Sequence, residues 1–146
     1  ELAPNAVSYS AAISACEKGG QWQLALSLLS CMPAAEVAPD VISFVAAISA
    51  CGRGAQWQSA LSLLSCMPAA RLAPGRISYN AAITACEKRG HWQSALSLLT
   101  GMPAEQAAPD EISYNAAISA CEKGGQWQLA LGLLSRMPVV RLAPDR

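Results

Sequence analysis

The sequence predicts an all-α protein, an α-solenoid built from four helix-turn-helix repeats, and two observations support this fold class. The first is a period of 35 residues, which is clearest in the prolines at 4, 39, 74, 109 and 144 and the tryptophans at 22, 57, 92 and 127. The second is the helical spacing of apolar residues within each period. Because periods of this length are typical of stacked helical hairpins, we divide the chain into repeats 6–40, 41–75, 76–110 and 111–145, a single array over residues 1–146.

The first helix of each repeat is expected to follow a Pro-Asp pair. In the second repeat Pro39 ends the preceding segment, and the Asp40 carboxylate can accept hydrogen bonds from the free amides of the next helix. That helix then runs from about Val41 to Arg53. We expect each first helix to end at a glycine in the left-handed C-cap conformation. These glycines are Gly19, Gly54, Gly90 and Gly124.

The second helix is expected to begin near the tryptophan and to end at a Met-Pro pair, because proline cannot continue a helix. The Met-Pro pairs stand at 32–33, 67–68, 102–103 and 137–138. Apolar residues form two stripes on this helix: Trp22, Ala25, Leu26 and Leu29 on one, and Leu24, Leu28 and Met32 on the other. A helix that is apolar on two sides needs neighbours on two sides, so each repeat should pack on the next and the tryptophans should anchor the core.

The composition argues against a membrane span and against metal or disulfide chemistry. Apolar residues make up 53% of the chain, but no apolar stretch approaches the roughly 18 residues that cross a bilayer. The six cysteines form no CxxC motif and accompany a single histidine. They recur at equivalent positions, at 16, 51, 86 and 121 and again at 31 and 66. Equivalent positions in stacked hairpins rarely reach disulfide distance, so we expect packed, reduced thiols in a reducing compartment and no metal.

The charge balance is unusual for a protein that binds nucleic acid. Ten basic and ten acidic residues cancel to a net charge of zero, whereas nucleic-acid-binding domains usually have a basic excess. The sequence also has no recurring acid–base pair, no phosphate-binding glycine loop and no metal-ligand cluster. We therefore expect neither an enzyme nor a cofactor.

The predicted binding face is the stripe of the first helix that lies opposite its buried side. In the first repeat this stripe comprises Val7, Ser10, Ala11, Ser14 and Lys18, which are spaced at i, i+3, i+4, i+7 and i+11. The residues are small or polar, with one aliphatic residue at the start and a cation at the end. The concave surfaces of helical solenoids bind ligands, and we expect the first helices to line that surface.

The period of 35, the Ile-Ser-Tyr-Asn segments at 77–80 and 112–115 and the closing Pro-Asp pairs together resemble the pentatricopeptide repeat family of single-stranded RNA binders. Tetratricopeptide repeats would show a period of 34. The resemblance covers essentially the whole chain, although the second helix, with Gln-Trp-Gln and an Ala-Leu-rich run, departs from the commonest family pattern. It implies a right-handed superhelix in which each repeat addresses about one nucleotide.

The resemblance also implies which residues select the base: the residue after the aromatic of the first helix, together with the last residue of the repeat. The pairs are then Ser10 with Asp40, Val45 with Gly75, Asn80 with Asp110, and Asn115 with Asp145. Family precedent makes Asn with Asp a uracil-preferring pair and Ser with Asp a weakly guanine-leaning pair. Val45 and Gly75 offer no side-chain hydrogen bond, so the second repeat should be nearly blind.

Two further series follow from the resemblance. An aliphatic residue in each first helix is expected to wedge between neighbouring bases, and a cation at the end of the helix is expected to contact phosphate. The wedge residues are Val7, Ile42, Ile77 and Ile112. The phosphate contacts are Lys18, Arg53, Lys88 and Lys123.

Several of these residues also have a simpler structural role. The aspartates at 40, 110 and 145 are predicted first as N-caps, and the cations can be helix C-terminal charges that the helix dipole favours. Asn80 and Asn115 are the strongest functional candidates, because asparagine is a poor residue for a helix interior. His91, which replaces a glutamine of the other repeats, is expected on the surface.

The leading functional prediction is sequence-selective binding of single-stranded RNA, with a preference for U at repeats three and four. The family implies a setting in organellar RNA processing, stability or translation, in a plastid or mitochondrion. The alternative is a structural or adaptor subunit that uses the solenoid to bind protein subunits of a larger assembly, which the neutral charge and the blank second pair favour. The chain opens without a recognisable targeting peptide, and we expect a fragment of a longer array.

Overall fold

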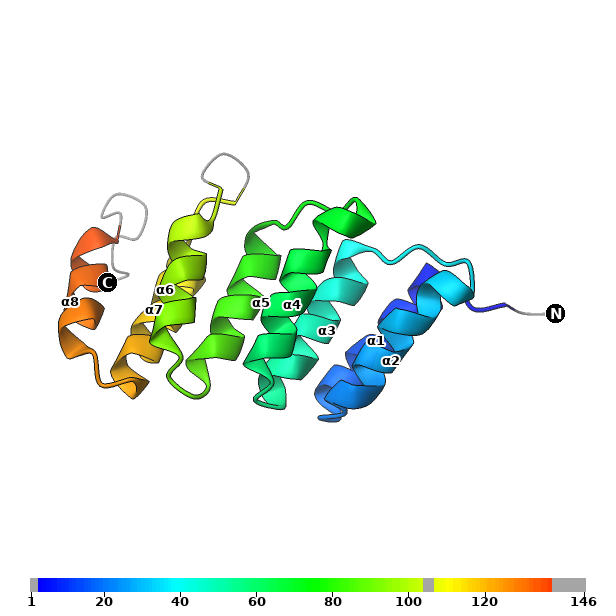
Figure 1. The fold of residues 1–146 in the computed structure, drawn as a ribbon, viewed down its shortest axis with the longest axis horizontal. Coiled ribbons are helices and arrows are strands. Elements are labelled where there is room, and N and C mark those ends of the chain that lie inside the picture. Colours follow the sequence, from blue (N-terminus) through cyan, green and yellow to red (C-terminus); the bar gives the residue numbers. More distant parts are fainter. Residues whose placement is uncertain (1–2, 104–106, 138–146) are drawn as a thin grey trace, which may run out of the picture.

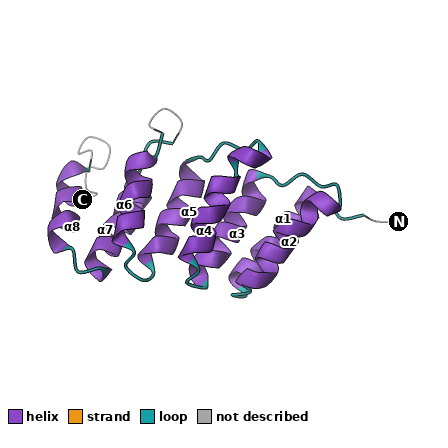
Figure 2. Ribbon diagram, in the orientation of Figure 1, coloured by secondary structure: helices purple, strands orange, loops and turns teal. Residues whose placement is uncertain are grey.

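The computed structural model describes residues 3–103 and 107–137, which form eight α-helices, one short 3₁₀ helix and no strand (Figures 1 and 2). The helices are α1 (Ala6–Lys18), α2 (Trp22–Ala34), α3 (Val41–Arg53), α4 (Trp57–Cys66), η1 (Pro68–Ala70), α5 (Arg76–Glu87), α6 (Trp92–Gly101), α7 (Glu111–Lys123) and α8 (Trp127–Arg136). None of these helices is both long and apolar enough to cross a bilayer. The predicted all-α solenoid is confirmed.

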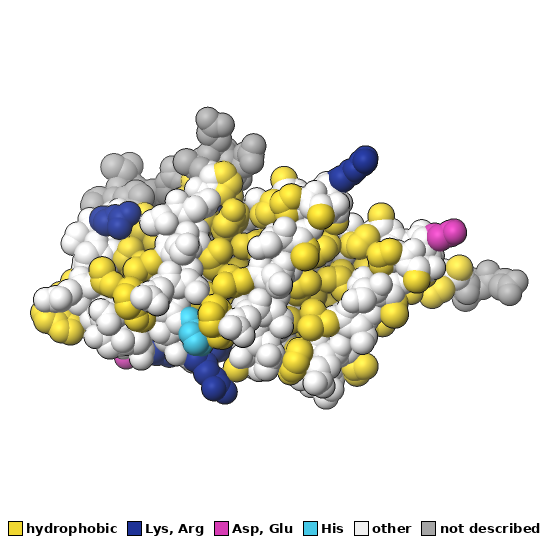
Figure 3. Space-filling view, viewed as in Figure 1, with side chains coloured by type: hydrophobic (Ala, Val, Ile, Leu, Met, Phe, Trp, Pro, Cys, Tyr) yellow, Lys and Arg dark blue, Asp and Glu magenta, His cyan; other side chains and the backbone are white. Residues whose placement is uncertain are grey.

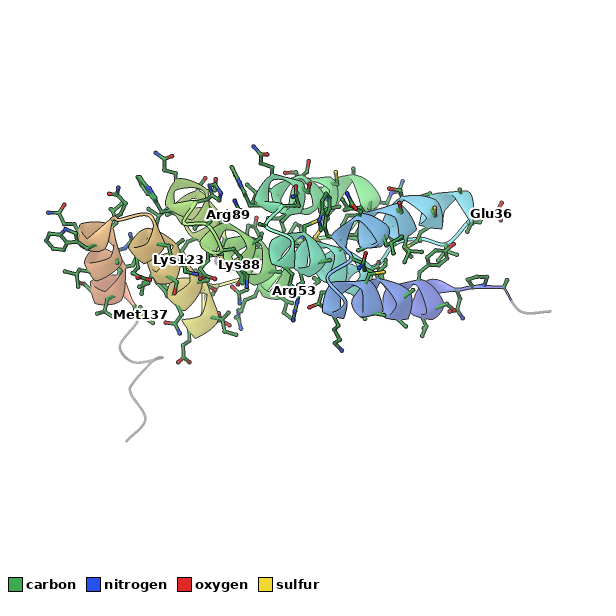
Figure 4. All side chains as sticks on the ribbon, turned by 90° about the horizontal axis from the view of Figure 1, so that it is seen from below. Glu36, Arg53, Lys88, Arg89, Lys123 and Met137 are labelled. Atoms are coloured by element: carbon green, nitrogen blue, oxygen red, sulfur yellow. The ribbon has the colours of Figure 1, made fainter. Side chains whose placement is uncertain are left out.

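The helices lie in two layers. Each odd-numbered helix packs on the next odd-numbered one and also on the helices that precede and follow it in the chain. Seen from below, the odd-numbered helices form one layer and the even-numbered helices the other (Figure 4). The core between the layers contains many alanine, cysteine and methionine side chains. Its largest fully buried side chains are Ile13, Met32, Ile48, Met67 and Ile83. Each hairpin therefore depends on its neighbours to bury its apolar sides.

Capping boxes start the first, third and seventh helices. The carboxylate of Asp40 accepts from the Ser43 backbone N–H at 2.9 Å, while the Ser43 hydroxyl accepts from the Asp40 backbone N–H at 3.0 Å. Asp110 and Ser113 repeat this reciprocal pair at α7, and Asn5 replaces the aspartate at α1. The predicted N-cap role of Asp40 and Asp110 is confirmed, and Asp145 lies outside the described residues.

The C-terminal ends of the first helices differ from the prediction by one position. Gly19, Gly54 and Gly124 have φ between −88° and −86°, so they are not left-handed. The left-handed residue is the next one in each repeat: Gly20, Ala55, Gly90 and Gly125. Only Gly90 of the predicted set therefore has the expected conformation, because the third repeat has Arg89 where the other repeats have the earlier glycine.

The tryptophans explain the glycine at that earlier position. A Cβ added at Gly54 would lie 2.3 Å from Cδ1 of Trp22, and one added at Gly124 would lie 2.3 Å from Cδ1 of Trp92. In the third repeat Arg89 supplies a Cβ there, and Trp57 instead stacks on His91 with ring centroids 4.2 Å apart. His91, predicted as a plain surface substitution, is thus half-buried and packs against the preceding repeat.

The second helices also differ from the prediction at two places. The first of them, α2, continues through Pro33 to Ala34, because the amides of Ala35 and Glu36 still close the last turn on the carbonyls of Cys31, Met32 and Pro33. The other described second helices end before their proline, as predicted. Leu24, which was assigned to an apolar stripe, is 54% exposed because no element covers the outer side of α2 there.

All six cysteines are free thiols, and they differ in burial, with Cys16 half-buried. Cys51, Cys86 and Cys121 are buried, and burial raises the pKa of Cys51 and of Cys86 to about 11. Cys31 and Cys66 are exposed on the second helices rather than packed as expected. No group of three metal-ligating side chains occurs within residues 3–103 and 107–137.

This difference predicts selective labelling of the thiols. With a thiolate-specific maleimide at neutral pH, we expect Cys31 and Cys66 to react quickly, because solvent reaches both sulfurs. Cys51, Cys86 and Cys121 should react only when the protein unfolds. Peptide mass mapping after a short pulse checks the order, and rapid native labelling of Cys51 or Cys86 would contradict the packing.

Candidate functional site

The outer side of the odd-numbered helices carries most of the residues predicted to bind. We call this side the odd-helix face. It comprises one exposed aliphatic residue from each first helix, the described residues of the predicted base-selecting pairs, and the cations Lys18, Arg53, Lys88 and Lys123. The aliphatic residues are Val7 (75% exposed), Ile42 (63%), Ile77 (69%) and Ile112 (58%). Four large apolar side chains at equivalent positions are therefore exposed to solvent, which is typical of an interaction surface.

The pair Asn80 and Asp110 joins helix α5 to the start of helix α7. The Asn80 side-chain amide donates to the Asp110 carboxylate at 3.1 Å, and the Ser113 hydroxyl lies within hydrogen-bonding distance of both side chains. Asn80 is 8% exposed and borders a cavity. The aspartate therefore caps α7 and orients the asparagine of α5 at the same time.

The pair Ser10 and Asp40 has the same arrangement with a hydroxyl in place of the amide. The Ser10 hydroxyl donates to the Asp40 carboxylate at 3.3 Å, and Ser43 occupies the position of Ser113. Ser10 is also 8% exposed. Its one proton is directed to Asp40, which leaves the oxygen lone pairs as acceptors.

Both aspartates are held as carboxylates. Partial burial alone would raise the pKa of Asp40 and of Asp110. Hydrogen bonds from the backbone and hydroxyl of the capping serine, and from Ser10 or Asn80, outweigh burial, so both pKa values lie below the usual value. The two carboxylates are thus fully ionised at neutral pH and act only as acceptors.

The second repeat lacks the carboxylate that caps a helix and orients a polar side chain. Gly75 caps α5 without a side chain, and Val45 has no polar atom to orient. The hydroxyl of Ser78, equivalent to Ser43 and Ser113, is fully buried and has no hydrogen-bond partner. A Cβ at Gly75 would meet nothing within 4 Å, so the space for an aspartate is open.

The substitution Gly75→Asp is expected to raise the free energy of unfolding by about 1 kcal/mol. Asp is a better N-cap than Gly by roughly a few tenths of a kcal/mol, and a partner for the buried Ser78 hydroxyl supplies the rest. The new carboxylate would accept from the Ser78 amide and hydroxyl, as Asp40 does from Ser43. Urea denaturation followed by circular dichroism measures the change. Gly75→Ala is the matched control, because it adds the Cβ without the carboxylate, and equal stability of both variants would contradict the assignment.

The fourth pair is only partly described. Asn115 is exposed on α7, and its predicted partner Asp145 lies outside the described residues. Within residues 3–103 and 107–137, Asn115 makes no side-chain hydrogen bond comparable to that of Asn80.

The predicted phosphate contacts divide into two kinds. Arg53 pairs with Glu17 of the preceding repeat, Nε to Oε2 at 3.1 Å, and Lys123 pairs with Glu87 in the same way. The equivalent partner of Lys88 would be residue 52, which is glycine. Neither Lys88 nor Lys18 has an ion pair in the described part of the chain. Figure 4 shows Arg53, Lys88 and Lys123 following one another along the solenoid.

A cavity of about 460 Å³ lies on the odd-helix face between α3, α5 and α7. It brings together the orienting pair, the aliphatic residues and the cations of adjacent repeats. Its lining includes Asn80, Ile77, Ile112, Arg53 and Lys88. The opposite surface is different: the view onto the even-numbered helices shows apolar and neutral polar groups with few charges (Figure 3).

Sequence reasoning missed two components of this face. One is the buried capping serine at 43, 78 and 113, whose spacing three residues after the N-cap is itself a capping-box signal. The other is the glutamate at positions 17 and 87, which pairs with the cation of the next first helix, Arg53 or Lys123, and not with the lysine beside it in the sequence. Glutamate recurs at positions 17 and 87 of the same register, and glycine replaces it at 52. This recurrence is the sequence signal for the ion pairs between repeats.

Comparison with protein families gives matches along most of the chain. A model of the pentatricopeptide repeat domain matches residues 1–54 and 27–89. A model of the PPR repeat family matches residues 74–123, and a PPR repeat model matches residues 112–140. No curated protein sequence matches this chain significantly.

Solved structures show the same fold. The crystal structure of the pentatricopeptide repeat protein PPR10 from maize superposes with a TM-score of 0.77 at 21% identity, over 92% of this chain and 19% of that chain. PPR10 in complex with an 18-nt psaJ RNA element gives a TM-score of 0.61 at 18% identity, over 94% of this chain and 25% of that chain. This chain therefore spans about a quarter or less of those proteins. With an eight-helix solenoid and family matches over more than half of its length, the chain belongs to the pentatricopeptide repeat family.

Proposed function

We propose that this chain binds single-stranded RNA along the odd-helix face and selects bases through the pair of residues that each repeat contributes. The observation that supports this most is the Asn80 amide, held by Asp110 at a cavity flanked by two exposed isoleucines and an unpaired lysine. PPR10, which shares the fold, has been solved in complex with RNA. A flat base between Ile77 and Ile112 would meet the amide at its edge and Lys88 near its phosphate.

The hydrogen-bond inventory of Asn80 is compatible with uracil. An asparagine amide has two N–H donors and one carbonyl acceptor. Asp110 takes one donor, and the Ser113 hydroxyl lies against the carbonyl. The group left for a ligand is therefore an N–H donor, which can donate to a carbonyl oxygen of uracil. Other bases also present acceptors, so the proposed preference for uracil rests on the family resemblance. Asn115 would select uracil in the same way in the fourth repeat.

Ser10 has the opposite character. Because its proton is directed to Asp40, its oxygen is free to accept. An acceptor complements the N–H donors on the Watson–Crick edge of guanine, so the first repeat would lean toward guanine. The second repeat would contribute stacking on Ile42 and Ile77 without selecting a base, since neither Val45 nor Gly75 presents a polar side-chain atom.

The number of free cations sets the expected salt dependence. For single strands, the slope of log affinity against log salt is about −0.7 for each phosphate contact. Two contacts, from Lys18 and Lys88, give a slope of about −1.4, whereas four contacts would give about −2.8. We expect the shallower slope, because Arg53 and Lys123 already pair with glutamates.

The proposed setting is organellar RNA processing, stability or translation, in a plastid or a mitochondrion. This setting rests on the family resemblance. Four repeats address about four nucleotides, which is too few to define one transcript, so this role would need further repeats in the same array.

Fluorescence-anisotropy titration of a labelled uridine-containing single-stranded RNA at two salt concentrations tests the proposal. We expect salt-sensitive binding that Lys88→Glu weakens by about tenfold at the lower salt. Arg71→Glu is the matched control, since it makes the same charge change in the exposed turn after η1. Equal weakening by both variants, or no binding at high micromolar protein, would count against RNA as the ligand.

The second candidate is an adaptor that binds protein subunits. The ion pairing of two of the four predicted phosphate cations and the net charge of zero favour it. The same titration separates the two, because an adaptor would show no dependence on RNA sequence or on Asn80.

A further inference from the structure

The N-terminus of helix α5 lacks the side-chain cap that α1, α3 and α7 have. In those three helices an N-cap side chain accepts a hydrogen bond from the third amide of the helix: Asn5 from Ser8, Asp40 from Ser43 and Asp110 from Ser113. At α5 the N-cap is Gly75, and the third amide belongs to Ser78. Because the first amides of a helix have no partner within the helix, the Ser78 amide lacks the acceptor that its equivalents have.

The hydroxyl of Ser78 is a second, independent sign that an acceptor is missing at this position. It is fully buried and has no hydrogen-bond partner among the described residues. The equivalent hydroxyls each lie close to a carboxylate oxygen, Ser43 to Asp40 at 2.8 Å and Ser113 to Asp110 at 2.9 Å. A buried hydroxyl without a partner destabilises a fold. Ser78 therefore holds an amide and a hydroxyl that, in α3 and α7, meet one carboxylate oxygen.

The space that an acceptor needs is open. A Cβ added at Gly75 would meet nothing within 4 Å, and Gly75 is only half-buried. Its φ of −106° and ψ of −170° belong to the same extended region as those of Asp40 and Asp110. The backbone thus has the arrangement of the capped helices. The group that is missing is one carboxylate on one methylene, which is the composition of acetate.

The electrostatics of this position also favour an anion. The N-terminus of a helix has a partial positive charge and free amides that bind anions. In α3 and α7 the carboxylates of Asp40 and Asp110 occupy that position, whereas α5 has neither a side-chain cap nor an acidic residue in its first turn. Arg76, the first residue of α5, adds a positive charge, which also acts on the Asp110 carboxylate. The start of α5 is therefore electropositive without a negative group of its own.

We propose that the N-terminus of α5 binds a small free carboxylate anion, of the size of acetate, through the backbone amide and the hydroxyl of Ser78. One oxygen of the anion would accept from both groups, as one oxygen of Asp40 accepts from both groups of Ser43. A bound anion would complete the N-cap of α5 and give the buried hydroxyl its partner. It would thereby stabilise the folded chain. This inference does not depend on RNA binding.

Titration of the ¹⁵N-labelled protein with sodium acetate, followed through the amide resonances, tests the proposal. Acetate replaces chloride at constant ionic strength, so screening by salt stays the same throughout. We expect the Ser78 amide resonance to shift and to saturate in the millimolar range of acetate. The amides of Ser43 and Ser113 are controls within the same chain, because Asp40 and Asp110 already occupy the equivalent position. Their resonances should not move.

Two variants separate this site from general effects of acetate. Gly75→Asp supplies the carboxylate covalently, so it should abolish the saturable shift at Ser78. Ser78→Ala keeps the amide and removes the hydroxyl, so it should raise the dissociation constant about tenfold, as expected for one hydrogen bond to a charged group. In the wild type, acetate at about ten times its dissociation constant should raise the folding equilibrium constant about tenfold. Gly75→Asp should not show this rise.

The three equivalent amides make the negative outcome equally clear. A Ser78 amide that does not shift, or shifts of the same size at Ser43 and Ser113, would overturn the proposal. An unchanged saturable shift in Gly75→Asp would overturn it as well, because the anion would then bind somewhere other than the N-cap position of α5.

Discussion

Replacing Asn80 by alanine is expected to lower the affinity for RNA with a uridine opposite the third repeat by about tenfold, or about 1.4 kcal/mol. The substitution removes the N–H donor that Asp110 orients and leaves the aliphatic residues and Lys88 in place. RNAs with another base at that position should lose much less, so the preference for uridine should largely disappear. Anisotropy titrations of paired RNAs that differ at that one nucleotide measure the change.

Val45→Ala is the matched control for this prediction. Val45 has the same register in the second repeat, but it offers no hydrogen bond and borders the same cavity. We expect less than a threefold change with Val45→Ala, and no change in preference at the position opposite the third repeat. If Asn80→Ala weakened all RNAs equally, Asn80 would be a structural residue of the α5–α7 contact and not a reader of the base.

Replacing Gly124 by alanine is expected to lower the free energy of unfolding by about 1–3 kcal/mol, which is the usual cost of overpacking. The new Cβ would lie 2.3 Å from Cδ1 of Trp92 and 2.9 Å from the Gly90 carbonyl oxygen. The Trp92 ring would have to leave its position at the contact between the third and fourth repeats. Urea denaturation followed by circular dichroism gives the change in stability.

Gly19→Ala is the control within the same chain, because it makes the same substitution at the same register of a helix that no tryptophan covers. Its Cβ would approach nothing closer than 3.3 Å, and φ at Gly19 is −88°. A glycine-to-alanine change at such a φ usually stabilises a protein by about 0.4–1 kcal/mol. Equal effects of the two substitutions would contradict the Trp-Gly packing.

The sequence was sufficient to predict the helical repeat because period, apolar spacing and capping residues all agree. Asp40 and Asp110 begin helices as their side chains require, and helix α3 has the predicted bounds. The differences arise where a contact between repeats decides the local conformation. The glycines at 54 and 124 are selected by the approach of a tryptophan and not by backbone conformation, and a single sequence does not show which ring lies against which turn.

Part of the geometry of the candidate site could also be predicted from the sequence. The pairs Ser10–Asp40 and Asn80–Asp110 are in contact, and the four aliphatic residues are exposed on one face. The state of the cations could not be predicted, because the glutamate that neutralises Lys123 lies 36 residues away, in another repeat. Gly52 stands at the position that glutamate occupies at 17 and 87. Because glycine has no carboxylate, Lys88 has no ion pair in the described part of the chain and lies free beside the cavity.

The proposal above requires the third repeat to select uracil through a hydrogen bond from the side-chain amide of Asn80. The most direct test is to titrate the wild type with four single-stranded RNAs that differ only in the nucleotide opposite that repeat. We expect the tightest binding for U and weaker binding for C, A and G, with a salt slope of about −1.4 in every case. Equal affinities for the four RNAs, or a preference for A, would contradict it.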